Sequence, residues 1–375
     1  MAHAYTPGLK VLETTLVRKE RRLPLPGDVV VKKGDEVNGE DVVARTMIPG
    51  DVHTVNVGGL LGILAEDIDG VMLKKVGDSV EKNEVIAESK GFFGLFRSVA
   101  SSPVSGTIEN VSKVTGQVII REPAKPIEIS AYIDGKVVEI VGKEGVVVES
   151  EASFIQGIFG IGGEARGEIV IAVESNSEIL EADHIKPEYK GKIIVGGSLV
   201  LYEAIQRAVE VQAVGIVVGG VEDITLKKFL GYDIGVAITG SENKGITLVI
   251  TEGFGKLNMV ERTFNLLRRI EGKLASINGA TQIRAGVIRP EIIVPLGKNR
   301  RSRQTKTKLE QGLEVGTIIR IIRAPYFGKI GKVVSLPVEL QKIETEARVR
   351  VVEIELDESK ERVLIPRANV EIIEV

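Results

Sequence analysis

Residues 191–220 read "GKIIVGGSLVLYEAIQRAVEVQAVGIVVGG", and the hydrophobic pattern changes twice within this segment. Two short apolar runs, at 192–195 and 213–218, flank a stretch in which apolar residues recur every three or four positions. Short continuous apolar runs are typical of strands buried on both faces, whereas the intervening period is that of an amphipathic helix. The segment therefore predicts a strand, a helix capped by Ser198, and a second strand parallel to the first.

The same alternation extends over residues 166–296, where we expect an α/β domain with a mainly parallel sheet. Its predicted strands end in glycine or polar residues, and strand carboxyl ends form the crevice in which open α/β sheets bind ligands. Tight strand-to-helix turns also require glycine, so a ligand site and a purely structural role are both open. The candidate rim residues are Gly196, Gly197, Ser198, Gly219, Gly220, Thr239, Gly240, Ser241, Glu242 and Glu252.

Residues 1–165 contain four segments that begin with a glycine, alternate apolar and polar residues, and reach a second glycine followed closely by valine. This period of two, with glycine at the break, predicts short hairpins and hence a β domain. The segments are GDVVVKKGDEV from Gly27, GVMLKKVGDSV from Gly70, GTIENVSKVTGQV from Gly106 and GKVVEIVGKEGVV from Gly135.

Part of this region resembles a biotinyl/lipoyl-type barrel-sandwich hybrid. The matching stretches are VGDSVEKNEVIAES at 76–89 and SSPVSGTIENVSKVTGQVI at 101–119, and PLPGDVVVKKGDEVNGEDVVAR at 24–45 is similar to the N-terminal region of RnfC-type electron-transport subunits. In carrier members of the fold, a modified lysine stands at the apex of a two-residue turn. Here Lys90 is followed by ten residues before SSPVSG, so a lysine-modified carrier remains only an alternative.

The insert after Lys90 contains an apolar cluster within GFFGLF: Phe92, Phe93, Leu95 and Phe96. Glycines in this segment allow the chain to bend, so the side chains sit in a projecting hairpin. They either fold back to plug the open end of the barrel or remain exposed and dock on a protein partner.

Residues 297–311 are expected to form a basic linker before a C-terminal domain at 312–375. The sequence GKNRRSRQTKTK at 297–308 has six basic residues and no acidic one. Such a run is either a solvated linker or an electrostatic contact for a nucleic-acid backbone. The residues proposed to contact a polyanion here are Lys298, Arg300, Arg301 and Arg303.

The C-terminal domain closely resembles a KOW domain of the NusG and ribosomal-protein type. The resemblance rests on EVGTIIRIIRAPYFGKIGKVVSLP, ARVRVVEIEL and ERVLIPRANVEIIE, and it implies a small five-stranded SH3-like barrel. Inward-facing positions are expected at Ile319, Ile321, Val333, Val351 and Ile354. In the family the loop after the first strand contacts RNA or protein, which implies an interface at Arg323, Tyr326, Phe327, Lys329 and Lys332.

The amino-acid composition limits the classes of function that the chain can have. The chain has 375 residues, no cysteine and three scattered histidines, so thiolate chemistry is excluded and we expect no metal site or cofactor. Residues from 297 onward include 16 basic and 12 acidic side chains, whereas the preceding residues include 33 and 40. A polyanion partner should therefore meet the C-terminal end. With no apolar run long enough for a membrane span and no export signal, a cytoplasmic protein is expected.

Together these features predict a multidomain, non-catalytic scaffold or adaptor that binds RNA or a ribosome- or transcription-type complex through the basic linker and the KOW barrel. A second interpretation is an enzyme or small-ligand sensor whose site is the glycine rim of the α/β domain. The third, a carrier that uses Lys90, is the least favoured by the spacing.

Overall fold

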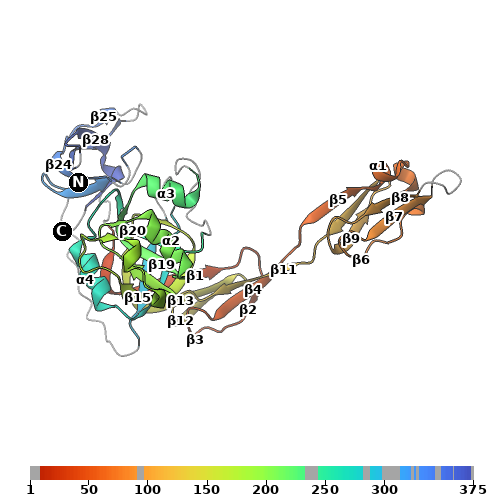
Figure 1. Ribbon diagram of the computed structural model, residues 1–375, viewed down its shortest axis with the longest axis horizontal. Helices are drawn as coiled ribbons and strands as arrows, with labels where there is room; N and C mark the ends of the chain where they lie inside the picture. Colours follow the sequence, from red (N-terminus) through yellow and green to blue (C-terminus); the bar gives the residue numbers. More distant parts are fainter. Residues whose placement is uncertain are drawn as a thin grey trace.

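The computed structural model places the chain in an elongated molecule that is mostly β and contains several sheets (Figure 1). We name four parts: the body, centred on residues 145–297; the arm, residues 42–48 and 125–130; the distal module, residues 52–121; and the C-terminal module, residues 313–372. The structure describes residues 9–90, 97–232, 244–281, 288–297, 313–321, 325–326, 329–342, 348–357 and 359–372.

The body contains one mixed sheet, which has thirteen strands within the described ranges. Its central strands β15, β17, β19 and β20 are parallel, and antiparallel strands extend the sheet on both sides. In sheet order the main path is β14 (Phe159–Ile161), β20 (Thr247–Phe254), β19 (Gly215–Val221), β17 (Lys192–Val195), β15 (Glu164–Ile171), β21 (Leu274–Asn278), β22 (Glu291–Pro295), β13 (Gly145–Gln156), β12 (Gly135–Val141) and β3 (Glu36–Val37).

Shorter elements complete the body. β1 (Val11–Arg22) pairs with β13, and β16 (Ile179–Leu180) pairs with β18 (Leu199–Val200), which also pairs with β19. Helices α2 (Tyr202–Glu210), α3 (Asp223–Leu230) and α4 (Glu261–Arg269) lie around the sheet (Figure 1). Two 3-10 turns, η3 (Ala182–His184) and η4 (Pro187–Tyr189), precede β17.

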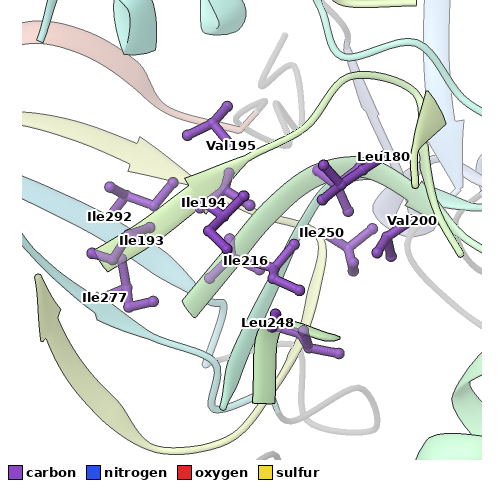
Figure 2. Close-up of a cluster of buried hydrophobic side chains, with 14 of the residues drawn as sticks. Leu180, Ile193, Ile194, Val195, Val200, Ile216, Leu248, Ile250, Ile277 and Ile292 are labelled. Carbon is purple, nitrogen blue, oxygen red and sulfur yellow. The ribbon is translucent and has the colours of Figure 1, made fainter. Parts of the chain in front are cut away.

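The parallel strands form the centre of the largest hydrophobic core. Ile194 on β17 pairs with Ile216 on β19, which pairs with Leu248 on β20, and all three side chains are fully buried (Figure 2). Burial from both sides explains why these strands are continuously apolar rather than alternating. The prediction of buried parallel strands from the runs 192–195 and 213–218 is therefore confirmed. The expectation of a mainly parallel sheet is wrong, because the described sheet also includes antiparallel strands from residues 11–161 and 274–295.

The predicted start of the first helix is wrong. Ser198 does not cap it: the chain first continues as β18, and α2 begins at Tyr202 after Leu201. The Ser198 hydroxyl instead donates a hydrogen bond to the carbonyl oxygen of Ser177, 2.8 Å away. The apolar residues Leu199 and Val200 pair as a strand because β16 and β19 offer backbone partners.

The distal module is inserted between the two strands of the arm. β4 (Val42–Ile48) and β11 (Lys125–Ser130) pair antiparallel, with β2 (Asp28–Val29) beside β4. Figure 1 shows the module at the far end of this ribbon. It has a hydrophobic core of its own, which includes Ile86, Ile108 and Ile120. Its elements are β5 (Val52–Asn56), α1 (Val57–Leu61), η1 (Ala65–Gly70), β6 (Ser79–Val80), β7 (Val85–Lys90), β8 (Arg97–Ser101), β9 (Gly106–Val111) and β10 (Gln117–Arg121).

Only two of the four glycine-initiated segments are hairpins. Those from Gly106 and Gly135 fold as β9 with β10 and as β12 with β13. In the segment from Gly27, β2 pairs with β4 while β3 pairs with β12, and in the segment from Gly70, Met72 pairs with Ala87 while β6 pairs with β9. The turns do form, since Gly34 and Gly77 have φ of 101° and 94°, but the flanking strands diverge to distant partners.

The C-terminal module contains a five-stranded antiparallel sheet within its described residues. Of the positions expected to face inward, Ile319, Ile321, Val333 and Ile354 belong to the hydrophobic core. Val351 is buried outside that core, and its neighbour Val352 takes the inward position because side chains alternate along β27. In sheet order the strands are β28 (Arg362–Pro366), β27 (Val351–Leu356), β24 (Ile330–Ser335), β23 (Ile318–Ile321) and β29 (Val370–Ile372). A second pair, β25 (Gln341–Lys342) with β26 (Arg348–Val349), and the turn η5 (Arg367–Asn369) lie beside them.

No helix in the described part of the chain has the length and apolar character needed to cross a membrane.

Candidate functional site

The predicted polyanion interface is only partly described. Tyr326, Lys329 and Lys332 lie at the β23–β24 connection and on β24. The residues Lys298, Arg300, Arg301, Arg303, Arg323 and Phe327 lie outside the described residues.

Backbone hydrogen bonds hold the β23–β24 connection in place. The amide of Lys329 donates to the carbonyl oxygen of Tyr326 at 3.1 Å, and the amide of Ile321 donates to that of Lys329 at 2.9 Å. The Tyr326 ring packs partly against the module's hydrophobic core. Lys332, between buried Gly331 and Val333 on β24, is exposed, as is Lys329. Two cations of this module are thus presented to solvent, and one of them, Lys329, is hydrogen-bonded through its backbone to Tyr326. Cations and aromatic rings are suited to phosphate contact and base stacking.

The distal module ends in the β7–β8 hairpin. Its two strands remain paired as far as Lys90 and Arg97. The predicted docking residues Phe92, Phe93, Leu95 and Phe96 fall between these strands, outside the described residues. Exposed apolar side chains also occur elsewhere on this module: Leu60, Leu64, Leu73, Val76, Val99 and Val114.

The rim glycines of the body are in close contact with neighbouring segments of the chain. A Cβ atom at Gly220 would lie 2.0 Å from the carbonyl oxygen of Gly255, and one at Gly197 would lie 2.4 Å from that of Glu178. Gly219 and Gly196 are similarly close to Leu257 and Leu180. These glycines are therefore required for the packing of the segments that cover the strand ends.

The remaining rim residues divide into two groups. Thr239, Gly240, Ser241 and Glu242 lie outside the described residues. Glu252, near the end of β20, is buried and engages the C-terminal module: its Oε2 lies 2.5 Å from Nη2 of Arg320. Its other oxygen, Oε1, accepts a hydrogen bond from the backbone amide of Val260 at 3.1 Å.

Glu252 belongs to a charge cluster that sequence reasoning missed, made of Glu252, Arg289, Arg320 and Glu371. Nη1 of Arg320 lies 3.1 Å from Oε1 of Glu371, and Nη1 of Arg289 lies 2.6 Å from Oε2 of the same carboxylate. Arg320 and Glu371 are 2% and 1% exposed, which is exceptional for such residues. The sequence feature that could have identified Arg320 and Glu371 is a single charged residue inside each of two apolar runs, IIRII at 318–322 and VEII at 370–373.

A second cluster joins the arm to the body around Tyr132, which is buried with a left-handed φ of 68°. Its hydroxyl lies 3.3 Å from Oε1 of Glu291, whose Oε2 pairs with Lys19 at 2.5 Å. The guanidinium of Arg21 lies over the Tyr132 ring and pairs with Glu164 through two hydrogen bonds. Burial raises the pKa of the Tyr132 hydroxyl well above its ordinary value of 10.0, and the nearby carboxylates raise it further.

Both clusters pair acidic with basic side chains. Neither cluster contains a histidine, and the one hydroxyl that lies beside a carboxylate in them is that of Tyr132. Among the residues that the structure describes, no group of three or more histidine or acidic side chains is placed to hold a metal ion. No protein family matches the chain in a search of family models, and no curated protein matches it in a sequence search.

Proposed function

We propose that the protein is an adaptor that binds RNA, or a machine built around RNA, through the basic segment 298–308 and the adjoining face of the C-terminal module. The observation that favours this function most is the charge distribution, with six basic and no acidic residues in 297–308 in an otherwise acidic chain. Basic side chains that neutralise phosphates release condensed counterions, which gives affinity without fixed geometry.

The C-terminal module supports the same function. We infer that it is a KOW-type barrel, because its five-stranded sheet has the buried positions that the resemblance implies. Exposed Lys329 and Lys332, together with the half-buried ring of Tyr326, would extend the contact of the basic segment. On the same proposal, the distal module, of the barrel-sandwich-hybrid type, would engage a protein partner.

The test is the binding of a single-stranded oligouridylate RNA to the full chain, followed by fluorescence anisotropy over a series of salt concentrations. The triple variant Arg300→Glu, Arg301→Glu and Arg303→Glu is expected to bind far more weakly. Loss of three phosphate contacts should reduce the slope of log K against log salt by about 2.

A matched control separates local contact from net charge. The variant Lys32→Glu, Lys33→Glu and Lys136→Glu makes the same change in net charge at exposed positions near the arm, and should bind RNA like the parent. No binding by the parent at low salt, or equal losses in both variants, would contradict the proposal.

A further inference from the structure

Strands β23 and β29 of the C-terminal sheet contact the body on the face opposite the hydrophobic core of the module. Arg320 on β23 and Glu371 on β29 are direct cross-strand neighbours, while Ile319 and Ile321 on either side of Arg320 point into the core. Alternation along a strand therefore places Arg320 and Glu371 on the outer face. In an isolated module this face would be in water, yet both residues are almost fully buried here.

The body supplies one charge of each sign to this contact. Glu252 comes from the end of β20 and Arg289 from the segment before β22, and these two side chains reach their partners Arg320 and Glu371 only when both parts are docked. Glu252 is itself fixed by the amide of Val260, which restricts the direction from which Arg320 can approach.

We propose that this cluster is an electrostatic latch, which docks the C-terminal module on the body in a single orientation. A buried charge without its partner is strongly unfavourable, so any shifted docking would leave at least one carboxylate or guanidinium uncompensated. Buried ion pairs add little net stability relative to apolar contacts, and their best-supported role is to specify register.

One hydrogen-bond donor of the latch has no acceptor among the described residues. Within the described ranges, the buried Nε of Arg320 has no hydrogen-bond acceptor. An unpaired buried donor costs free energy and offsets part of the attraction between the charges. The docked arrangement is consequently selective in geometry, and its net stability is smaller than the number of its ion pairs implies.

Docking has a consequence for the basic segment. Its two flanks are both attached: the amide of Leu296 donates to the carbonyl oxygen of Glu151 on β13, and Leu313 packs on the core of the C-terminal module. With the latch closed, Leu296 and Leu313 are therefore held at a fixed separation.

The experiment uses the absence of cysteine from the chain, which allows a spin label at each of two introduced cysteines. Glu203→Cys on α2 and Glu361→Cys in the C-terminal module change exposed positions on the two parts. Double electron–electron resonance on the full chain should give one narrow distance distribution. In Glu252→Gln the side-chain oxygen can still accept from Val260 while the charge opposite Arg320 is lost, and we expect the narrow distribution to be replaced by a broad one.

Two further variants make the test decisive. Glu252→Met combined with Arg320→Met removes one charge of each sign, leaves Arg289 facing Glu371, and should restore the narrow distribution. Glu355→Gln alters an exposed carboxylate of the same sheet, paired with Arg362, and should leave the distribution unchanged. A broad distribution in the parent, a narrow one in Glu252→Gln, or a broad one in the double variant would each overturn the latch.

Discussion

The distal module and the C-terminal module are both small β structures with their own hydrophobic cores, but they are positioned by different means. The chain enters the distal module from β4 and leaves it into β11, so two paired strands fix its place. The C-terminal module meets the body through buried charges. The two paired strands of the arm hold the distal module away from the body. The C-terminal module is held against the body by contacts between side chains.

Ion pairs at the junction of the arm and the distal module reinforce this contrast. Lys125 pairs with Asp51 at 2.9 Å, and His53 lies 3.0 Å from Glu122. The Lys125 ammonium, through its hydrogen bond and its charge, lowers the pKa of Asp51. The Lys125–Asp51 pair is exposed to solvent, and exposed pairs contribute little to stability. The strands of the arm, rather than these charges, therefore position the distal module.

The largest effect is expected from Arg320→Leu. This change leaves the carboxylates of Glu252 and Glu371 buried without the guanidinium that joins them, and breaking a buried pair in this way costs about 3–5 kcal/mol. Guanidinium chloride unfolding of the full chain measures the loss. Arg362→Leu, which removes an exposed pair on the same sheet, should change the free energy of unfolding by about 0–1 kcal/mol. Similar losses of unfolding free energy in both variants would show that the buried Arg320 cluster contributes no more to stability than an exposed ion pair.

A core substitution in the distal module should have a local effect. Ile108→Ala removes a fully buried side chain and should destabilise this module by about 2–5 kcal/mol. Because the body has a separate core, its unfolding transition should stay at the parent temperature in scanning calorimetry. Val114→Ala, at a position 89% exposed, is the matched control and should leave both transitions unchanged. A shift of the body transition in Ile108→Ala would contradict independent unfolding.

The smallest effect concerns the junction around Tyr132 at alkaline pH. Below pH 10 the tyrosine is protonated in both folded and unfolded chains, so its contribution to stability is constant. Above pH 10 the unfolded chain loses this proton while the buried hydroxyl keeps it, because its pKa is raised in the fold. The free energy of unfolding should then fall by about 1.4 kcal/mol per pH unit through this group.

Urea unfolding at a series of pH values checks this slope. Tyr132→Phe should reduce the alkaline fall by that amount. Tyr202→Phe, at a half-buried residue on α2, should leave it unaltered. An alkaline slope that is the same in Tyr132→Phe as in the parent would rule out the assignment.

Local patterns in the sequence predicted where strands and turns lie better than they predicted which strands pair with each other. The apolar runs at 192–195 and 213–218 specify buried strands because burial on both faces leaves no polar position. The turns at Gly34 and Gly77 were also predictable, since a positive φ favours glycine. The pairing of β3 with β12, and of β6 with β9, was not, because it depends on residues distant in the chain.

For the candidate site, too, the sequence indicated individual residues but not their long-range partners. Arg320 and Glu371 stand in apolar strands, which could have marked them as buried charges, but no local pattern identifies Glu252 as a partner 68 residues away. The basic segment was evident from composition alone, since a run of like charges requires no knowledge of the fold. Its contacts with RNA remain a prediction.

The insertion of the distal module also bears on the order in which the chain folds during synthesis. The ribosome completes residues 52–121 before β11 emerges, and this segment contains all the members of its own core. Once that core forms, the chain on either side leaves from neighbouring antiparallel strands, because β5 and β10 pair along their length. A folded insert therefore brings β4 and β11 together and removes most of the loop-closure entropy that a disordered segment 49–124 would impose on their pairing.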